Sequence, residues 1–104
     1  MTVQERTKNV ARFAPEMCSF NLGSMNFSLH PPLKRIKEWR FEWEPKYLEA
    51  SKDFVFKNTF ADLEHLCALV RKHRTKPELE AYDVGHLYNL AHIVAEGMIQ
   101  PPLH

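Results

Sequence analysis

The sequence lacks any hydrophobic run close to the roughly 20 residues needed to cross a bilayer. Its first residues, Met1–Arg6, carry no apolar signal core, so we expect neither secretion nor membrane insertion and place the protein in the cytoplasm. It has only two cysteines, Cys18 and Cys67, with no C-x-x-C motif, and each lies among apolar residues. This favours buried free thiols over a disulfide or a ligand pair.

Compact metal-ligand spacings are also missing. The sequence has six histidines, but none belongs to an H-x-H, H-E-x-x-H or similar motif. His86 and His92 are six positions apart, which places them on different faces of a helix. We therefore expect no metal site, and no cofactor, that this chain builds alone.

A strong charge of one sign is absent as well. The net charge of +1 gives no field that would attract nucleic acid or a membrane surface. The segment Lys34–Lys46 mixes aromatic residues with five basic and three acidic ones. Interleaved acids disfavour a phosphate-binding track. We interpret this segment as an aromatic arm that packs on the rest of the domain or on a neighbouring subunit.

The sequence does contain an alternation of helices and strands. Thr2-Val3-Gln4-Glu5 and Thr59-Phe60-Ala61-Asp62 are capping signals that predict helix starts. The predicted order is helix, strand, helix, strand, helix, and this order implies parallel strands joined by helical crossovers. The predicted elements are a helix over 3–12, a strand over 17–22, a helix ending in the basic run 71–74, a strand over 79–84 and a last helix ending at Gly97, with Leu87, Leu90, Ala91 and Val94 on its apolar face.

Between the first strand and the second helix, the pattern is irregular. Trp39, Phe41 and Trp43 alternate with charged residues, which predicts a short extended piece. Pro45 suits the first turn of a brief helix through Ala50, and residues 54–56 form another extended apolar run. We assign residues 1–104 to one domain, in which residues 30–57 form an insertion or arm between the two main strands.

Polar residues gather where the two strands end. Asn21, Gly23 and Ser24 follow the first strand, and Asn21 and Ser24 offer neutral groups suited to a carboxylate or ketone oxygen. The same residues are also ordinary turn residues, so a structural role stays open.

The second strand contributes three further candidates. Glu80 sits in an apolar strand, where a carboxylate needs a ligand or an ion-pair partner. Asp83 and His86 flank Gly85 beyond it. Asp83 could instead cap the next helix.

Two long motifs carry a resemblance to a known family. The stretch Lys76-Pro77-Glu78-Leu79-Glu80-Ala81-Tyr82-Asp83-Val84-Gly85-His86-Leu87-Tyr88-Asn89-Leu90-Ala91-His92 and the earlier stretch 15–27 resemble the β-keto acid cleavage enzymes, whose type member is the 3-keto-5-aminohexanoate cleavage enzyme. The resemblance implies an α/β fold, a fragment of a (β/α)8 TIM barrel. This chain would be the middle third, with residues 17–22 and 79–84 as about strands four and five.

The resemblance also implies an activity. Such an enzyme transfers acyl groups between a β-keto acid and acetyl-CoA, giving acetoacetate and a new CoA thioester. Its divalent metal, usually zinc, is held by an H-x-H pair on an early strand and a glutamate on a late one, and an aspartate–arginine pair on late strands is catalytic. This sequence has no H-x-H. We therefore assign no catalytic residue and no metal ligand here.

The resemblance suggests substrate contacts instead. Asn21 matches a substrate-contacting polar position that carries a hydroxyl in type members, and Glu80 matches a glutamate that helps to hold the substrate. The predicted substrate-binding residues are Asn21, Gly23, Ser24, Glu80, Asp83 and His86. The full-length form is expected to be a homo-oligomer that binds neither nucleic acid nor membrane. The alternative is a non-catalytic truncated remnant or a partner-dependent interaction fragment.

Overall fold

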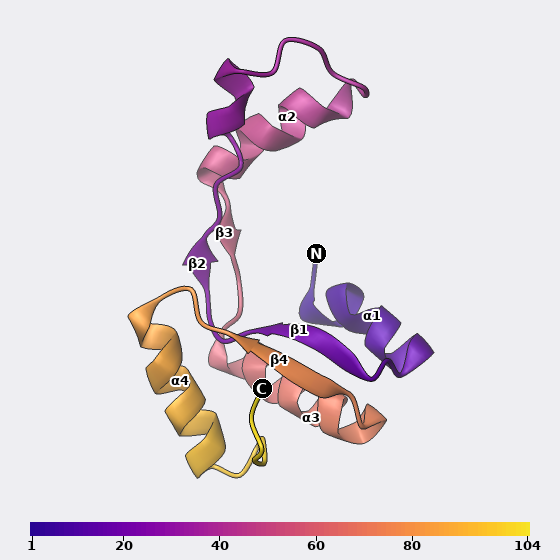
Figure 1. Ribbon diagram of the computed structural model, residues 1–104, viewed down its shortest axis with the longest axis vertical. Coiled ribbons are helices and arrows are strands. Elements are labelled where there is room, and N and C mark those ends of the chain that lie inside the picture. The colour runs from indigo at the N-terminus through magenta and orange to yellow at the C-terminus, as the bar shows by residue number, and fades with distance from the viewer. The chain divides into compact units, whose positions relative to one another are not determined.

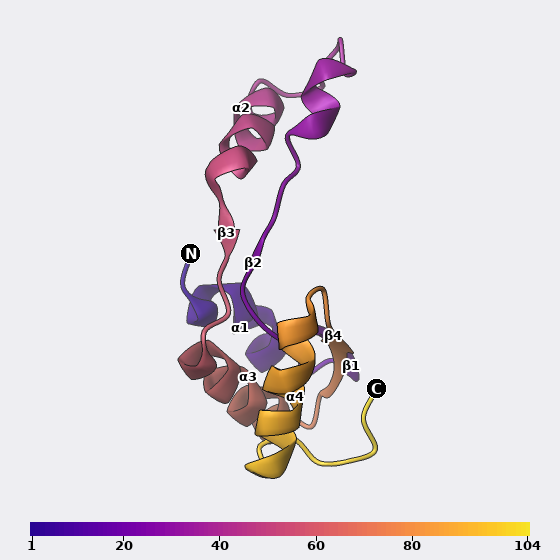
Figure 2. The ribbon, with the colours of Figure 1, turned by 90° about the vertical axis from the view of Figure 1, so that its left-hand side faces the viewer.

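The computed structural model describes every residue from Met1 to His104, and Figures 1 and 2 show it from two directions. The chain divides into two compact units. One, here called the α/β unit, consists of Met1–Ser24 and Lys57–His104; the other, here called the arm, consists of Met25–Phe56. The α/β unit contains α1 (Val3–Phe13), β1 (Met17–Asn21), α3 (Phe60–His73), β4 (Lys76–Glu80) and α4 (Val84–Ala95).

Both predicted capping boxes are present. The hydroxyl of Thr59 accepts the N–H of Asp62 at 3.3 Å, and the Asp62 carboxylate accepts the N–H of Thr59 at 3.0 Å. The hydrogen bonds that the Asp62 carboxylate accepts lower its pKa, and the one from the backbone N–H of Thr59 has the largest effect. Thr2 and Glu5 form the same arrangement at the start of α1. Each box satisfies N–H groups that a helix start leaves unpaired, so the sequence correctly marks where both helices begin.

The two main strands pair in parallel, which confirms a mixed α/β unit with parallel strands. The register runs from Met17 opposite Lys76 to Asn21 opposite Glu80. The predicted bounds of the second strand, 79–84, are wrong, because β4 begins at Lys76 and ends at Glu80. Pro77 is tolerated because it lies near the start of the strand. The strand ends early because Asp83 is already the N-cap of α4.

Nine apolar residues form the core of the α/β unit. They come from α1, β1, α3, α4 and the residues just after β1 and α4: Val3, Phe20, Leu22, Leu63, Leu66, Cys67, Val70, Ile93 and Ile99. The predicted buried face of α4 is partly wrong, because Leu87 is 55% exposed while His86 and Ile93 are buried. The helix is rotated so that His86 and Asn89 face the segment after β1, where both form hydrogen bonds.

The arm contains short elements only. They are β2 (Met25–Asn26), the 3-10 turn η1 (Pro31–Lys34), α2 (Trp43–Ala50), the 3-10 turn η2 (Ser51–Asp53) and β3 (Val55–Phe56). β2 and β3 pair antiparallel, with Met25 opposite Phe56.

The predicted extended piece over 39–43 is wrong. Residues 40–42 bend and turn, and Trp43 opens α2. The Glu44 carboxylate accepts the N–H of Phe41 at 2.9 Å, and this bond favours the turn into the helix.

Among the helices of the whole chain, none combines the length and the apolar character that a membrane span requires.

The capping box of α3 gives a stability prediction. Replacing Thr59 by alanine should lower the free energy of unfolding by about 1 kcal/mol, because the N–H of Asp62 loses its acceptor. Urea unfolding followed by circular dichroism measures this.

Lys57→Ala is the matched control. Lys57 lies 3.2 Å from the same Asp62 carboxylate, but its side chain is 68% exposed. An exposed ion pair contributes less than about 1 kcal/mol, so this change should matter less than the loss of the cap. A larger effect for Lys57→Ala than for Thr59→Ala would contradict the assigned role of the cap.

Candidate functional site

The last residues of the two parallel strands lie side by side. Asn21 ends β1, Glu80 ends β4, and the two are register partners. The N–H of Leu22 donates to the carbonyl of Glu80 at 3.0 Å, so the pairing continues to the point where both strands stop. A neutral amide and a carboxylate therefore meet at the carboxyl edge of the sheet, which is the edge where α/β proteins bind ligands.

Side-chain amides hold the segment that follows β1. The Asn58 amide donates to the carbonyl of Asn21 at 2.8 Å, and the Asn89 amide donates to the carbonyl of Leu22 at 2.8 Å. The backbone N–H of Asn58 donates to the hydroxyl of Ser24 at 2.9 Å. These bonds satisfy backbone groups that no strand partner reaches, so they fix the position of residues 21–24.

Asn58 is itself held from a third element. The Arg6 guanidinium, from α1, donates to the Asn58 side-chain oxygen at 2.7 Å and to the Lys57 carbonyl at 3.0 Å. Sequence reasoning missed Asn58 and Asn89. The available signals were an asparagine just before a capping box and an asparagine three positions after His86 on an otherwise apolar helix.

His86 is buried, with 3% of its surface exposed, and both of its ring nitrogens are engaged. Nδ1 accepts the backbone N–H of Tyr82 at 3.2 Å. An N–H can only donate, so Nδ1 carries no proton and the ring proton lies on Nε2. Nε2 then donates to the carbonyl of Ser24 at 3.2 Å. His86 thus joins the segment after β1 to the segment after β4 as a neutral ring.

Gly23 lies where a side chain would collide with these groups. A Cβ there would lie 2.6 Å from Cδ2 of His86 and 2.8 Å from Nδ2 of Asn89. Both distances are far below van der Waals contact, so the backbone approaches His86 and Asn89 more closely than any other residue type would allow. Glycine is required by packing against the His86 ring.

The Glu80 carboxylate has a local partner. The hydroxyl of Tyr82 donates to Oε2 of Glu80 at 2.8 Å. This hydrogen bond raises the pKa of Tyr82, because it stabilises the neutral phenol beside a negative charge. Glu80 is half-buried at the end of the strand rather than enclosed within it. Tyr82 was not predicted from the sequence.

Asn21 and Asp83 differ in whether their side-chain oxygens find a hydrogen-bond donor within the protein. The side-chain oxygen of Asn21 is buried and has no hydrogen-bond partner. Asp83 is satisfied as the N-cap of α4, since its Oδ1 accepts the N–H of Gly85 at 2.8 Å. The capping alternative for Asp83 is therefore confirmed, and the Asn21 amide is the polar group of this edge that is left for a further partner.

Five of the six predicted site residues are linked by direct contacts or by strand register. Asn21, Gly23, Ser24, Glu80 and His86 meet around the two strand ends, while Asp83 is used to start α4. That these residues contact a substrate stays a prediction. The arrangement can bind and orient a small polar molecule, because it offers an amide, a hydroxyl and a carboxylate at one edge.

The chain alone does not fit the metal that the resemblance implies. No group of three or more His, Cys, Asp or Glu side chains is placed to hold an ion. Both cysteines are free, with Cys67 buried and Cys18 half-buried. Burial raises the pKa of the Cys67 thiol to about 11, which removes the thiolate form that binds metals.

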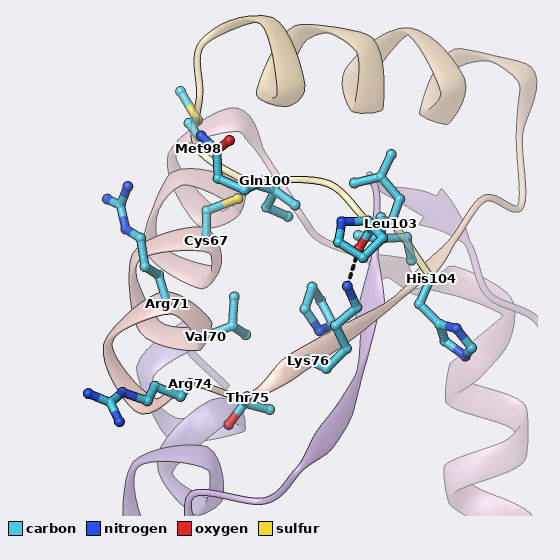
Figure 3. A pocket seen from close by; sticks show the side chains of 14 residues that line it. Cys67, Val70, Arg71, Arg74, Thr75, Lys76, Met98, Gln100, Leu103 and His104 are labelled. Atoms are coloured by element: carbon cyan, nitrogen blue, oxygen red, sulfur yellow. Dashed lines mark hydrogen bonds between the residues drawn. The ribbon is translucent and has the colours of Figure 1, made fainter.

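A cavity of about 280 Å³ lies elsewhere in the α/β unit. It is bounded by the second half of α3, by Lys76, Pro77 and Leu79 of β4, and by the segment that follows α4. Figure 3 shows Cys67 and Val70 facing it, while Arg71 and Arg74 point outward. Lys76 donates to the carbonyl of Pro102 across its rim. The cavity extends along β4 as far as Leu79, the residue before Glu80, but none of the six predicted site residues lines it.

Parallel strands between helices, with polar residues at their carboxyl ends, define a mixed α/β protein. The chain belongs to the β-keto acid cleavage enzyme family, whose sequence profile matches residues 1–104.

Two curated relatives agree with this family. The chain is 53% identical over 102 residues to a 3,5-dioxohexanoate:acetyl-CoA acetone transferase of Paraburkholderia graminis, covering 98% of this chain and 33% of the relative. It is 30% identical over 99 residues to a 3-dehydrocarnitine:acetyl-CoA trimethylamine transferase of Rhizobium meliloti, covering 95% of this chain and 26% of that relative. The chain thus spans between a quarter and a third of the length of these relatives.

The contact at Gly23 gives a second prediction. Gly23→Ala should destabilise the protein by about 1–3 kcal/mol, because the new methyl group overlaps the His86 ring. In the double variant Gly23→Ala/His86→Ala, the two losses should not add, because removing the ring makes room for the methyl group. Thermal or urea unfolding of the three variants measures the coupling.

Gly85→Ala is the control for this change. Its Cβ would meet only Oδ1 of Asp83, at 3.2 Å, and alanine favours the helix that Gly85 occupies. We expect a change of less than about 1 kcal/mol. Additive losses in the double variant would show that the overlap with His86 is not the cause.

The raised pKa of Tyr82 gives a third prediction. In an ultraviolet titration of the phenols, Tyr82 should ionise at higher pH than it does in the Glu80→Gln variant, because the neutral amide removes the negative charge beside the hydroxyl. Tyr82→Phe identifies the signal of this residue. An unchanged titration in Glu80→Gln would mean that the bond between Tyr82 and Glu80 does not persist in solution.

Proposed function

We propose that this chain forms the substrate-binding part of an acetyl-CoA-dependent β-keto acid cleavage enzyme, at about strands four and five of a (β/α)8 barrel. In the reaction, the β-keto acid R–CO–CH2–COO⁻ and acetyl-CoA give acetoacetate and the thioester R–CO–S–CoA. The group R–CO moves from carbon to sulfur, and the acetyl group moves from sulfur to carbon. Both relatives are named as acetyl-CoA-dependent transferases, which supports this co-substrate.

The observation that carries the proposal is the pairing of Asn21 with Glu80. The two residues end neighbouring parallel strands, and the Asn21 side-chain oxygen is buried without a partner. A buried amide without a partner costs about 1–3 kcal/mol unless another group satisfies it. A substrate that carries a hydrogen-bond donor, such as the enol hydroxyl of a β-diketone, would supply that group.

Each polar group has a separate part in this proposal. Asn21 orients the substrate through its amide, and Glu80 faces the variable group R. Ser24 uses its oxygen lone pair to accept the N–H of Asn58, so its hydroxyl proton stays available to a carboxylate or ketone oxygen. His86 and Gly23 act on the protein itself by holding the two segments together.

The choice of trial substrate rests on the relative at 53% identity, which supports 3,5-dioxohexanoate. Glu80 is a charged carboxylate that accepts the neutral Tyr82 hydroxyl, and Asn21 offers an unpaired amide oxygen. Both are hydrogen-bond acceptors, so we propose a β-keto acid whose group R carries a donor, such as the enol hydroxyl of this substrate.

A metal ion is outside what this chain supplies. Its residues do not fit a metal site, and no step of the proposal is assigned to one. In this proposal, the residues of this chain bind and orient the substrate, and the other groups that the reaction requires come from outside residues 1–104.

The test uses a chimera in which residues 1–104 replace the matching stretch of the Paraburkholderia graminis transferase. The chimera should convert 3,5-dioxohexanoate and acetyl-CoA to acetoacetate. Asn21→Ala in the chimera should lower kcat/KM about 10- to 100-fold, because it removes about 1–3 kcal/mol of hydrogen bonding to the enol hydroxyl of the substrate. Glu80→Ala should lower kcat/KM by a similar factor, because it leaves the Tyr82 hydroxyl without its acceptor and removes the polar group that faces R.

Glu78→Ala is the matched control. Glu78 lies on the same strand two residues before Glu80 and is exposed. We expect its kcat/KM to stay within about threefold of the unsubstituted chimera. Equal effects of Glu78→Ala and Glu80→Ala in folded proteins would refute the substrate role of Glu80. A folded chimera with no turnover would refute the proposed function and favour a non-catalytic remnant.

A further inference from the structure

Asn58 bonds to two of the predicted substrate-contacting residues at once. Its side-chain amide donates to the carbonyl of Asn21 at 2.8 Å, and its backbone N–H donates to the hydroxyl of Ser24 at 2.9 Å. Only 4% of its surface is exposed. A buried residue that bonds to both Asn21 and Ser24 fixes their positions relative to each other.

The direction of the Asn58 amide decides whether it can hold Asn21. A carbonyl oxygen can only accept, so Nδ2 of Asn58, and not Oδ1, has to face Asn21. The two ends of a side-chain amide have nearly the same shape, so packing alone does not distinguish them. A charged donor on the opposite side does distinguish them, because it attracts Oδ1 and repels the N–H groups of Nδ2.

Arg6 of α1 is this charged donor. Its Nη2 donates to Oδ1 of Asn58 at 2.7 Å and to the carbonyl of Lys57 at 3.0 Å. A guanidinium has donors and no acceptor, so it cannot bond to a reversed amide. Arg6 therefore holds the Asn58 amide with its N–H groups toward Asn21.

The contacts of Arg6 are directed at the segment before α3. Apolar packing already joins α1 to α3, since Val3 and Leu63 belong to the same core. Both acceptors of Nη2 lie just before Thr59, the N-cap of α3. The guanidinium thus bonds to the residues that hold the end of β1, in addition to any contribution to helix packing.

We propose that Arg6 is a positioning residue for the β-keto acid, which acts through Asn58 on Asn21 and Ser24. The inference rests on the proposed function, in which Asn21 and Ser24 contact this substrate. Without the guanidinium, the Asn58 amide is free to reverse, and a reversed amide sets Oδ1 against the Asn21 carbonyl. The substrate-contacting groups then lose their fixed geometry, although Arg6 itself contacts no substrate.

Steady-state kinetics of the chimera described above tests this role. Arg6→Met removes the donor and keeps a long side chain. The KM for 3,5-dioxohexanoate should rise about tenfold, whereas the KM for acetyl-CoA should change by less than about twofold. Arg6→Lys should recover most of the loss, because an ammonium group has three donors and a single nitrogen reaches both acceptors here.

Two variants of the same helix are the controls. Arg12→Met makes the same substitution at an exposed arginine of α1. Thr2→Ala removes the N-cap of α1, whose hydroxyl accepts the N–H of Glu5 at 3.2 Å, so it lowers stability at a distance from Asn58. Both should leave the two KM values within about twofold of the unsubstituted chimera, because a smaller folded fraction lowers kcat and not KM.

A second substitution tests the route through Asn58. Asn58→Asp keeps an acceptor for Arg6 but has no N–H group for the Asn21 carbonyl, so it should raise the KM for 3,5-dioxohexanoate about tenfold with Arg6 in place. In Arg6→Met/Asn58→Asp, the two increases should not multiply, because both substitutions act on the same hydrogen bond. Asn58→Asp carries the test alone if Arg6→Met does not fold.

Three results would overturn the positioning role in an active chimera. They are an unchanged KM for 3,5-dioxohexanoate in Arg6→Met or Asn58→Asp, equal increases for both substrates, and increases that multiply in the double variant. An unsubstituted chimera that folds without turnover would instead refute the proposed function, and the role of Arg6 with it. The two failures are therefore distinguished by the activity of the unsubstituted chimera.

Discussion

The parallel pairing of β1 with β4 is the constraint on which the candidate site depends. Its register sets Asn21 opposite Glu80, and the pairing extends by the bond from the Leu22 N–H to the Glu80 carbonyl. A shift of one residue would turn one of these two side chains to the opposite face of the sheet. The chemistry of this edge therefore depends on backbone hydrogen bonds as much as on the polar side chains themselves.

Beyond the strand ends, side chains instead of a neighbouring strand form the hydrogen bonds to the backbone carbonyl groups. Asn58, Asn89 and His86 come from the approach to α3 and from α4, and they bind the carbonyls of residues 21, 22 and 24. These segments are far apart in sequence and meet only through the fold. The two helices that cover the sheet thus also fix the loop that carries the candidate substrate groups, so core stability and site geometry are coupled.

The sequence predicted the order of elements in the α/β unit because its strongest signals are local. A capping box depends on four consecutive residues, and both boxes were recognised correctly at Thr2 and Thr59. The error at β4 has a local cause. Ala81 and Tyr82 could continue a strand, but Asp83 caps α4 by accepting the N–H of Gly85. The period of α4 was misjudged because a buried histidine does not register as an apolar position.

The two strand ends were predicted as a site, but the roles within it required coordinates. Asn21 and Glu80 could be singled out from a polar residue at the end of an apolar strand, and the structure makes them register partners. The asparagines at 58 and 89 give weaker signals. Asparagine is common before a helix start, where Asn58 lies, and a polar residue such as Asn89 inside a helix can equally face solvent. Only the fold shows that their amides point at backbone carbonyls.

Gly23 shows how the position of the backbone and the side-chain contacts of the site depend on each other. Its value lies in a missing side chain, which lets the His86 ring and the Asn89 amide approach the backbone after β1. Without that approach, the ring could not reach the Ser24 carbonyl while also accepting the Tyr82 N–H. Because Tyr82 in turn holds the Glu80 carboxylate, a contact that begins at one glycine extends to the charged group at the other strand end. The polar edge is therefore a connected network in which the residues that shape the backbone are as necessary as those that would meet a substrate.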